Sequence, residues 1–110
     1  MDIKMNKIPE FNESVVLEAS ATASSGTEVI IPFEEADQKT VILVTNSGGS
    51  SADVTFKKGD MLQGTEDKVI SVPANKTIAV ALESGKFKNN DGNLKATVSA
   101  SLGFQLVVLP

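Results

Sequence analysis

Short segments of alternating apolar and polar residues constrain the fold of this chain more than any other feature of its sequence. Thr77–Glu83 and Leu94–Ala100 show the pattern most clearly, and clusters of Gly, Asn, Asp or Pro separate such segments along most of the 110 residues. A period of two is typical of a half-buried β-strand, because successive side chains point to opposite faces of a sheet. The pattern therefore predicts an all-β protein.

The apolar segments recur at intervals of about 8–12 residues, which is typical of an antiparallel sandwich. They are residues 14–20, 27–33, 40–46, 53–57, 68–72, 77–83, 94–101 and 104–109. We expect an antiparallel β-sandwich, Ig-like or jelly-roll-like, with about eight strands in a single domain over residues 13–110. The continuous apolar run in 40–46 predicts burial on both faces of that strand. We expect 40–46 with 53–57, and 94–101 with 104–109, to form hairpins.

Residues 1–12 differ in character from the rest of the chain. They are polar, contain Pro9 and show no clear period. We expect an N-terminal arm that is either flexible, as termini commonly are, or ordered only against a partner. Phe11 is the candidate contact residue of this arm.

Two loops carry further candidates. We expect Met61 and Leu62, in the loop 58–67, to fill one end of the core. The loop 89–93 has the sequence Asn-Asn-Asp-Gly-Asn, whose oxygen atoms suit calcium. The same residue types also form tight turns, and the sequence favours the turn. We therefore predict no metal site and no cofactor.

An aromatic residue between two cations, Lys86-Phe87-Lys88, is the strongest candidate for a contact with a partner. An exposed aromatic side chain at this position would anchor an interface, because buried aromatic residues dominate binding energy. The alternative is that Phe87 lies under its loop as part of the core. With Phe11, these three residues are the predicted partner-binding set.

The composition excludes several classes of function. The sequence contains neither His nor Cys, so the commonest general base, the thiol nucleophile and disulfides are all absent. No glycine-rich run matches a phosphate loop, and no serine lies in a nucleophile elbow. We expect a protein that is not an enzyme. The net charge of −4 disfavours nucleic acid as a partner, and no apolar stretch approaches the ~20 residues of a membrane span.

Several stretches occur together in an order that is similar to a known group of proteins. They are Lys39–Asn46, Ala52–Asp60, Gln63-Gly64 with Asp67, Ser71–Thr77, Leu82–Asn89 and Val107–Pro110. This set resembles small β-sandwich proteins encoded beside the major capsid gene in tailed phages and prophages. The resemblance covers about residues 27–110 and leaves out the N-terminal arm.

The resemblance implies a structural protein of the virion, made in the host cytoplasm, that binds capsid protein at the capsid surface as a head decoration protein. A homo-oligomer, by analogy a trimer, is compatible with that role, and a monomer is equally consistent with the composition. One alternative is a tail component. Another is an Ig-like adhesion or carbohydrate-binding module, with or without calcium, which the absence of Trp and Tyr disfavours.

Overall fold

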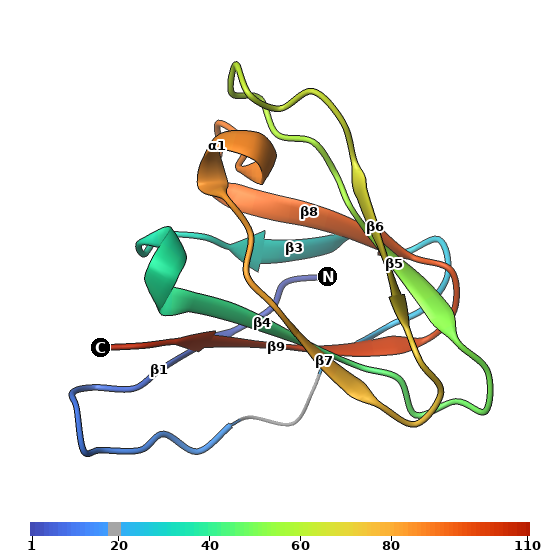
Figure 1. Ribbon diagram of the computed structural model, residues 1–110, viewed down its shortest axis with the longest axis horizontal. Coiled ribbons are helices and arrows are strands. Elements are labelled where there is room, and N and C mark those ends of the chain that lie inside the picture. Colours follow the sequence, from blue (N-terminus) through green and yellow to red (C-terminus); the bar gives the residue numbers. More distant parts are fainter. Residues whose placement is uncertain (18–20) are drawn as a thin grey trace.

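Two β-sheets packed face to face form the protein, as predicted (Figure 1). The computed structural model describes residues 1–17 and 21–110. The five-stranded sheet contains β1 (Met5–Lys7), β2 (Ala21–Ala23), β9 (Leu102–Val108), β4 (Thr40–Thr45) and β7 (Thr77–Val80). The four-stranded sheet contains β3 (Val29–Pro32), β8 (Asn93–Val98), β5 (Ala52–Phe56) and β6 (Lys68–Val72).

The helical elements of the described residues are the short turns η1 (Asp37–Lys39) and α1 (Ser84–Phe87). Within the same residues, no helix has both the length and the apolar character needed to cross a membrane. The first turn falls in the acidic segment after β3, and the second lies between β7 and β8.

The order of the strands identifies the type of sandwich. β2 pairs with β9, β3 with β8, β4 with β7 and β5 with β6, so the strands nest like one long hairpin. The hairpin is rolled up, because β4 also pairs with β9 and β5 also pairs with β8. This arrangement is a jelly roll. The bend of the long hairpin is the β5–β6 loop, which therefore lies at one end of the molecule (Figure 1).

Alternation along the strands directs one set of side chains into the core, as the sequence predicts. Val54 and Phe56 of β5 are fully buried, and Ile42 of β4 is 1% exposed. Val41 and Leu43, on the other face of β4, are only half-buried. The prediction of burial on both faces of this strand is wrong, because the second layer of the sandwich covers one face. The largest fully buried side chains are Phe33, Phe56, Phe104, Ile31, Ile42, Leu94, Leu102 and Leu106.

Both predicted hairpins are wrong, because the members of each pair lie in different sheets. Residues 46–51 carry the chain from β4 in one sheet to β5 in the other. The side chain of Asn46, which is 2% exposed, holds this crossing. Its Oδ1 accepts the N–H of Gly48 at 2.9 Å, and its Nδ2 donates to the carbonyls of Ser50 at 2.8 Å and Val72 at 3.0 Å.

The N-terminal residues depart from the arm predicted over residues 1–12. Asp2 forms a parallel bridge with Ile30 of β3, and β1 pairs in parallel with β9. Residues 1–7 therefore belong to the sandwich, and the domain begins before residue 13. The physical reason is that β3 and β9 would otherwise present unpaired backbone groups at the edges of the two sheets.

The strand predicted over residues 14–20 is wrong for its described part. Residues 14–17 form no strand, and Val16 is 89% exposed. Residues 18–20 lie outside the described residues. The strand at this point of the chain is β2, which lies between the predicted segments 14–20 and 27–33. Residues 8–17 loop away from the sheets at the lower edge of Figure 1.

Candidate functional site

The β5–β6 loop meets α1 at one end of the jelly roll (Figure 1). We call residues 57–67 the tip loop and this end of the molecule the tip. The backbone N–H of Gly59 donates to the carbonyl of Lys86 at 2.9 Å, and that of Asp60 donates to the carbonyl of Lys88 at 3.2 Å. The carboxylate of Asp60 also accepts the N–H of Asn90 at 2.9 Å. Two segments distant in sequence thus form one unit.

Two glycines permit this close packing. A Cβ atom at Gly59 would collide with the backbone carbonyl of Lys88, and one at Gly64 would collide with the carbonyl of Gly59. Neither obstacle is a flexible side chain, so any other residue would force the backbone apart. The backbone of the tip loop is therefore packed closely against itself and against the α1 region.

Asp67 fastens the base of the tip loop. Its carboxylate accepts the backbone N–H of Lys58 at 2.8 Å and lies 3.6 Å from the ammonium group of Lys57. The hydrogen bond from the Lys58 backbone, together with the positive charge of Lys57, lowers the pKa of Asp67 below its ordinary value. The charged carboxylate of Asp67 thus joins the two ends of the tip loop.

The apex of this ordered loop carries exposed apolar side chains. Leu62 is 99% exposed and Met61 is 48% exposed. The prediction that both fill the end of the core is wrong. When a fully exposed leucine lies on a loop that is hydrogen-bonded at its base, a partner can bury it with less loss of conformational entropy than on an unattached loop. This combination is suited to anchoring a protein interface.

Phe87, unlike Met61 and Leu62, is a core residue. It is 8% exposed and packs in the hydrophobic core. The single turn α1 directs it inward, because the carbonyl of Glu83 accepts the N–H groups of Lys86 and Phe87 at 3.1 and 3.2 Å. The proposal of Phe87 as a partner contact is therefore corrected: the alternative of a core residue holds.

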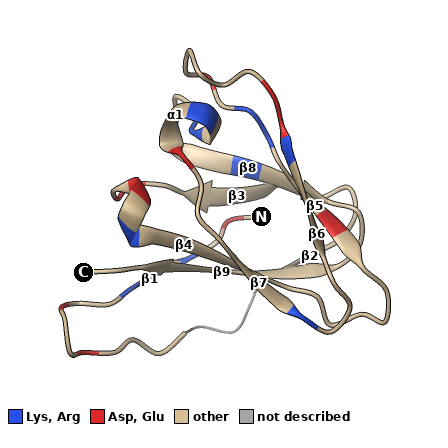
Figure 2. Ribbon diagram, in the orientation of Figure 1, with Lys and Arg blue, Asp and Glu red and all other residues tan. Residues whose placement is uncertain are grey.

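The two neighbouring lysines remain at the surface of the tip. The ammonium group of Lys86 lies 3.4 Å from the carboxylate of Glu83, and its side chain is about half exposed. Lys88 is half-buried. Figure 2 shows lysine and acidic residues side by side at this end of the molecule, so the tip carries both signs of charge.

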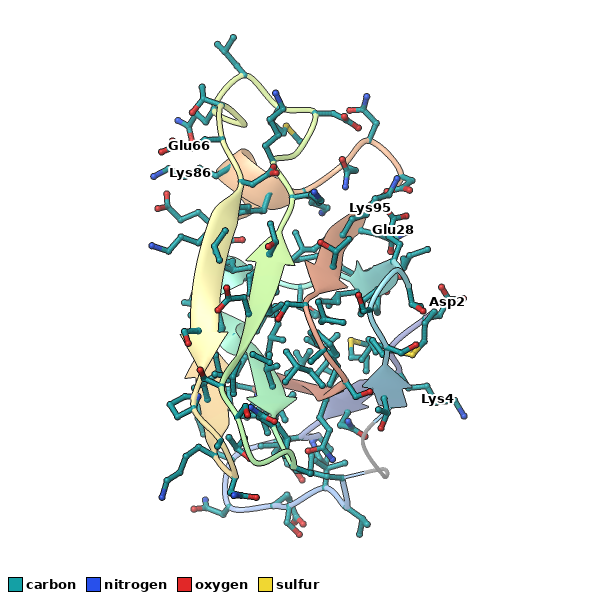
Figure 3. The ribbon with its side chains drawn as sticks, turned by 90° about the vertical axis from the view of Figure 1, so that its right-hand side faces the viewer. Asp2, Lys4, Glu28, Glu66, Lys86 and Lys95 are labelled. Atoms are coloured by element: carbon teal, nitrogen blue, oxygen red, sulfur yellow. The ribbon has the colours of Figure 1, made fainter. Side chains whose placement is uncertain are left out.

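A groove of about 360 Å³ runs beside the apex of the tip loop. Leu82 and Phe87 contribute apolar surface to it, while Glu66, Lys68 and Lys86 contribute charge. Figure 3 shows Glu66 and Lys86 at the same edge of the molecule.

Phe11 does not join the other predicted partner-binding residues. It is 77% exposed, in the loop that leaves the sandwich at the opposite end from α1 (Figure 1). The predicted set thus divides between two surfaces. Lys86 and Lys88 lie at the tip, Phe87 lies beneath it, and Phe11 lies far from it.

The side chains of the 89–93 loop are used in forming a turn. The carboxylate of Asp91 accepts the N–H of Asn93 at 3.1 Å, and Asn89 donates to the carbonyl of Asn93 through its backbone at 2.9 Å and its side chain at 3.2 Å. Gly92 has a positive φ of 87°. Among residues 1–17 and 21–110, no group of three or more acidic side chains is placed to hold a metal ion.

Sequence reasoning missed Leu62 as a surface residue. The signal available was its position, since Met61 and Leu62 lie between Gly59 and Gly64 in a long loop. Comparison of the chain with family models, with curated proteins and with solved structures gave no match.

Proposed function

We propose that this protein is a non-enzymatic structural component of a tailed-phage or prophage particle that binds the capsid surface as a decoration protein. We further propose that it binds through the tip. The single observation that carries the proposal is that Leu62, although almost entirely exposed, lies on a loop whose conformation is held by hydrogen bonds and close backbone contacts. Such a loop is ordered before it meets a partner, so binding costs less entropy.

The physical requirements of a decorated shell support this role. A decoration protein binds many equivalent sites, and links between copies add to the affinity of each single contact. A small, rigid contact such as Leu62 with Met61 and the adjacent groove is sufficient under those conditions. The resemblance of residues 27–110 to proteins encoded beside capsid genes points to the shell as the partner.

The jelly-roll fold is compatible with a decoration protein, although it is also compatible with other functions. This fold occurs in viral capsid proteins and also in lectins and cupins, and a fold alone does not determine function. The residues at the tip favour some of these classes of function over others. The groove at the tip has no Trp or Tyr to stack on a sugar ring, because the chain contains neither residue. A protein partner therefore fits this surface better than a carbohydrate.

Co-sedimentation with empty heads of the particle tests the proposal. The wild-type protein is expected to pellet with the heads at micromolar concentration and in saturable amounts. Leu62→Asp places a charge at the centre of the contact and is expected to abolish pelleting while leaving the thermal midpoint unchanged. Leu109→Asp alters a leucine that is 38% exposed after β9, away from the tip, and should pellet normally. If both variants pellet equally, the tip is not the surface that binds the capsid. If the wild-type protein does not pellet, it is not a decoration protein of these heads.

A further inference from the structure

One open side of the jelly roll is closed by the N-terminal seven residues. We call the edge formed by β3 of one sheet and β9 of the other the seam. At the β3 side, the N–H of Ile3 donates to the carbonyl of Ile30 at 2.9 Å, and the N–H of Ile30 donates to the carbonyl of Met1 at 2.7 Å. Ile3 is 5% exposed and belongs to the core. The first three residues are thus held by β3 and by one buried apolar side chain.

The same segment then crosses to the other sheet. β1 pairs in parallel with residues 106–108 of β9, and the N–H of Ile8 donates to the carbonyl of Val108 at 2.9 Å. The side chain of Asn6, which is 6% exposed, donates to the carbonyl of Leu106 at 3.0 Å. Residues 1–7 therefore join the edges of both sheets. Figure 3 shows the flanking side chains of Asp2 and Lys4 at the outer surface of this side.

The jelly roll does not need this segment to complete its strand order. β2 to β9 supply all four nested pairs, and β1 is an addition to the edge of β9. The seam is thus a strand-accepting site whose bound sequence is known, because the chain itself occupies it.

The connection between this segment and the rest of the chain is long. Residues 8–20 separate β1 from β2, and thirteen residues can span about 45 Å when extended. The longest dimension of the molecule is 37 Å. The connection can therefore carry residues 1–7 to the seam of a neighbouring molecule.

The described part of the connection carries exposed apolar side chains. Its backbone forms a local turn, in which the N–H of Glu13 donates to the carbonyl of Glu10 at 3.3 Å. Phe11, Val16 and Leu17 are 77%, 89% and 40% exposed. Three exposed apolar side chains in one segment offer a surface that a partner can cover.

We propose that the seam binds residues 1–7 of a second copy of this chain, so that neighbouring subunits exchange their N-terminal strands. Every contact at the seam is the same whether the segment comes from its own chain or from a neighbour, so exchange costs little. The exchanged connections would run between two sandwiches, where Phe11, Val16 and Leu17 can be buried. Reciprocal exchange gives a dimer, and exchange around a ring gives a trimer. The inference does not depend on capsid binding, since the seam and the tip use different residues.

Cysteine cross-linking of the full-length chain tests strand exchange, because the chain has no cysteine of its own. Asp2 and Ile30 are bridge partners across the seam, so the double variant Asp2→Cys/Ile30→Cys places two thiols at disulfide distance. The protein is refolded at high concentration, oxidised and analysed by denaturing electrophoresis without reductant. Exchange is expected to give a covalent dimer or trimer of the 11.5 kDa chain. An internal disulfide in a monomer would overturn the proposal.

The matched control is Asp2→Cys/Ser47→Cys, which pairs the same N-terminal thiol with an exposed residue of the β4–β5 crossing. It should give only the background of random cross-links. Light scattering of the unmodified chain supplies an independent measurement if the double variant does not fold. Exchange is supported if the wild-type chain has a multiple of the monomer mass and the Ile3→Asp variant has the mass of a monomer. A monomer at every concentration, or an oligomer that Ile3→Asp leaves intact, contradicts it.

Discussion

Gly59 lies so close to the backbone carbonyl of Lys88 that no side chain fits between the tip loop and the segment that follows α1. Gly59→Ala is therefore expected to lower the free energy of unfolding by about 2 kcal/mol, because two hydrogen-bonded backbones must move apart. Urea denaturation measures the change. Gly49→Ala is the control, since a Cβ atom there meets nothing within 4 Å. It should be neutral or stabilise the fold by about 0.5 kcal/mol. Equal effects at both glycines would show that the tip loop is not closely packed.

Two phenylalanines separate a core role from a surface role. Phe87→Ala is expected to cost about 3–4 kcal/mol of stability, because Phe87 is 8% exposed and its removal leaves a cavity. Phe11→Ala should change stability by less than about 0.5 kcal/mol, because Phe11 is 77% exposed. Thermal and urea denaturation of the two variants provide the comparison. A loss of stability in Phe87→Ala as small as that in Phe11→Ala would indicate that Phe87 is a surface residue.

Asn46 is a buried polar residue that connects the two sheets. Asn46→Ala removes one acceptor and two donors, leaving the N–H of Gly48 and the carbonyls of Ser50 and Val72 without this partner. We expect a loss of about 2 kcal/mol, since the carbonyl of Val72 is buried and an unsatisfied buried group costs about 1–3 kcal/mol, whereas Gly48 and Ser50 are exposed to water. Asn90→Ala, at an exposed asparagine, is the control and should lie within about 0.5 kcal/mol of the wild type. A loss at Asn46 no larger than at Asn90 would contradict its role at the crossing.

The pH dependence of stability should show the contribution of Asp67. Its pKa is lowered from 3.8 in the folded state, so the carboxylate binds a proton less readily when the protein is folded. The resulting stabilisation is present above the unfolded pKa and is lost as the pH falls through the folded pKa. Asp67→Asn should therefore have a lower thermal midpoint than the wild type at pH 7, and the difference should disappear toward pH 2. Glu66→Gln at the neighbouring exposed residue is the control. A difference that persists in acid would assign the effect to something other than the charge.

The alternation of residues predicted most strands but not their partners. The segment predicted over residues 68–72 coincides with β6, because a period of two is a local property of the sequence. The pairing of strands, in contrast, depends on contacts throughout the jelly roll. The apolar segments on either side of Gly48-Gly49 resemble a hairpin in sequence, yet the buried side chain of Asn46 directs the chain into the other sheet.

The candidate site was predictable only in part, for a similar reason. Leu62 and Phe87 are both apolar residues in glycine-containing loops. Their opposite exposure follows from the contact between Gly59 and Lys88, which joins loops separated by more than twenty residues. β1 was also beyond local reasoning, because Met5-Asn6-Lys7 has no apolar alternation and forms a strand only against the edge of β9.

Electron cryo-microscopy of empty heads incubated with the protein tests the central claim most directly, because it shows both whether the shell is decorated and which end of the sandwich touches it. The account predicts density for the jelly roll at symmetry-related positions, with the tip loop against the capsid and Leu62 buried at the contact. Bare heads at saturating protein, or a sandwich that touches the shell while the tip loop points into solvent, would contradict it.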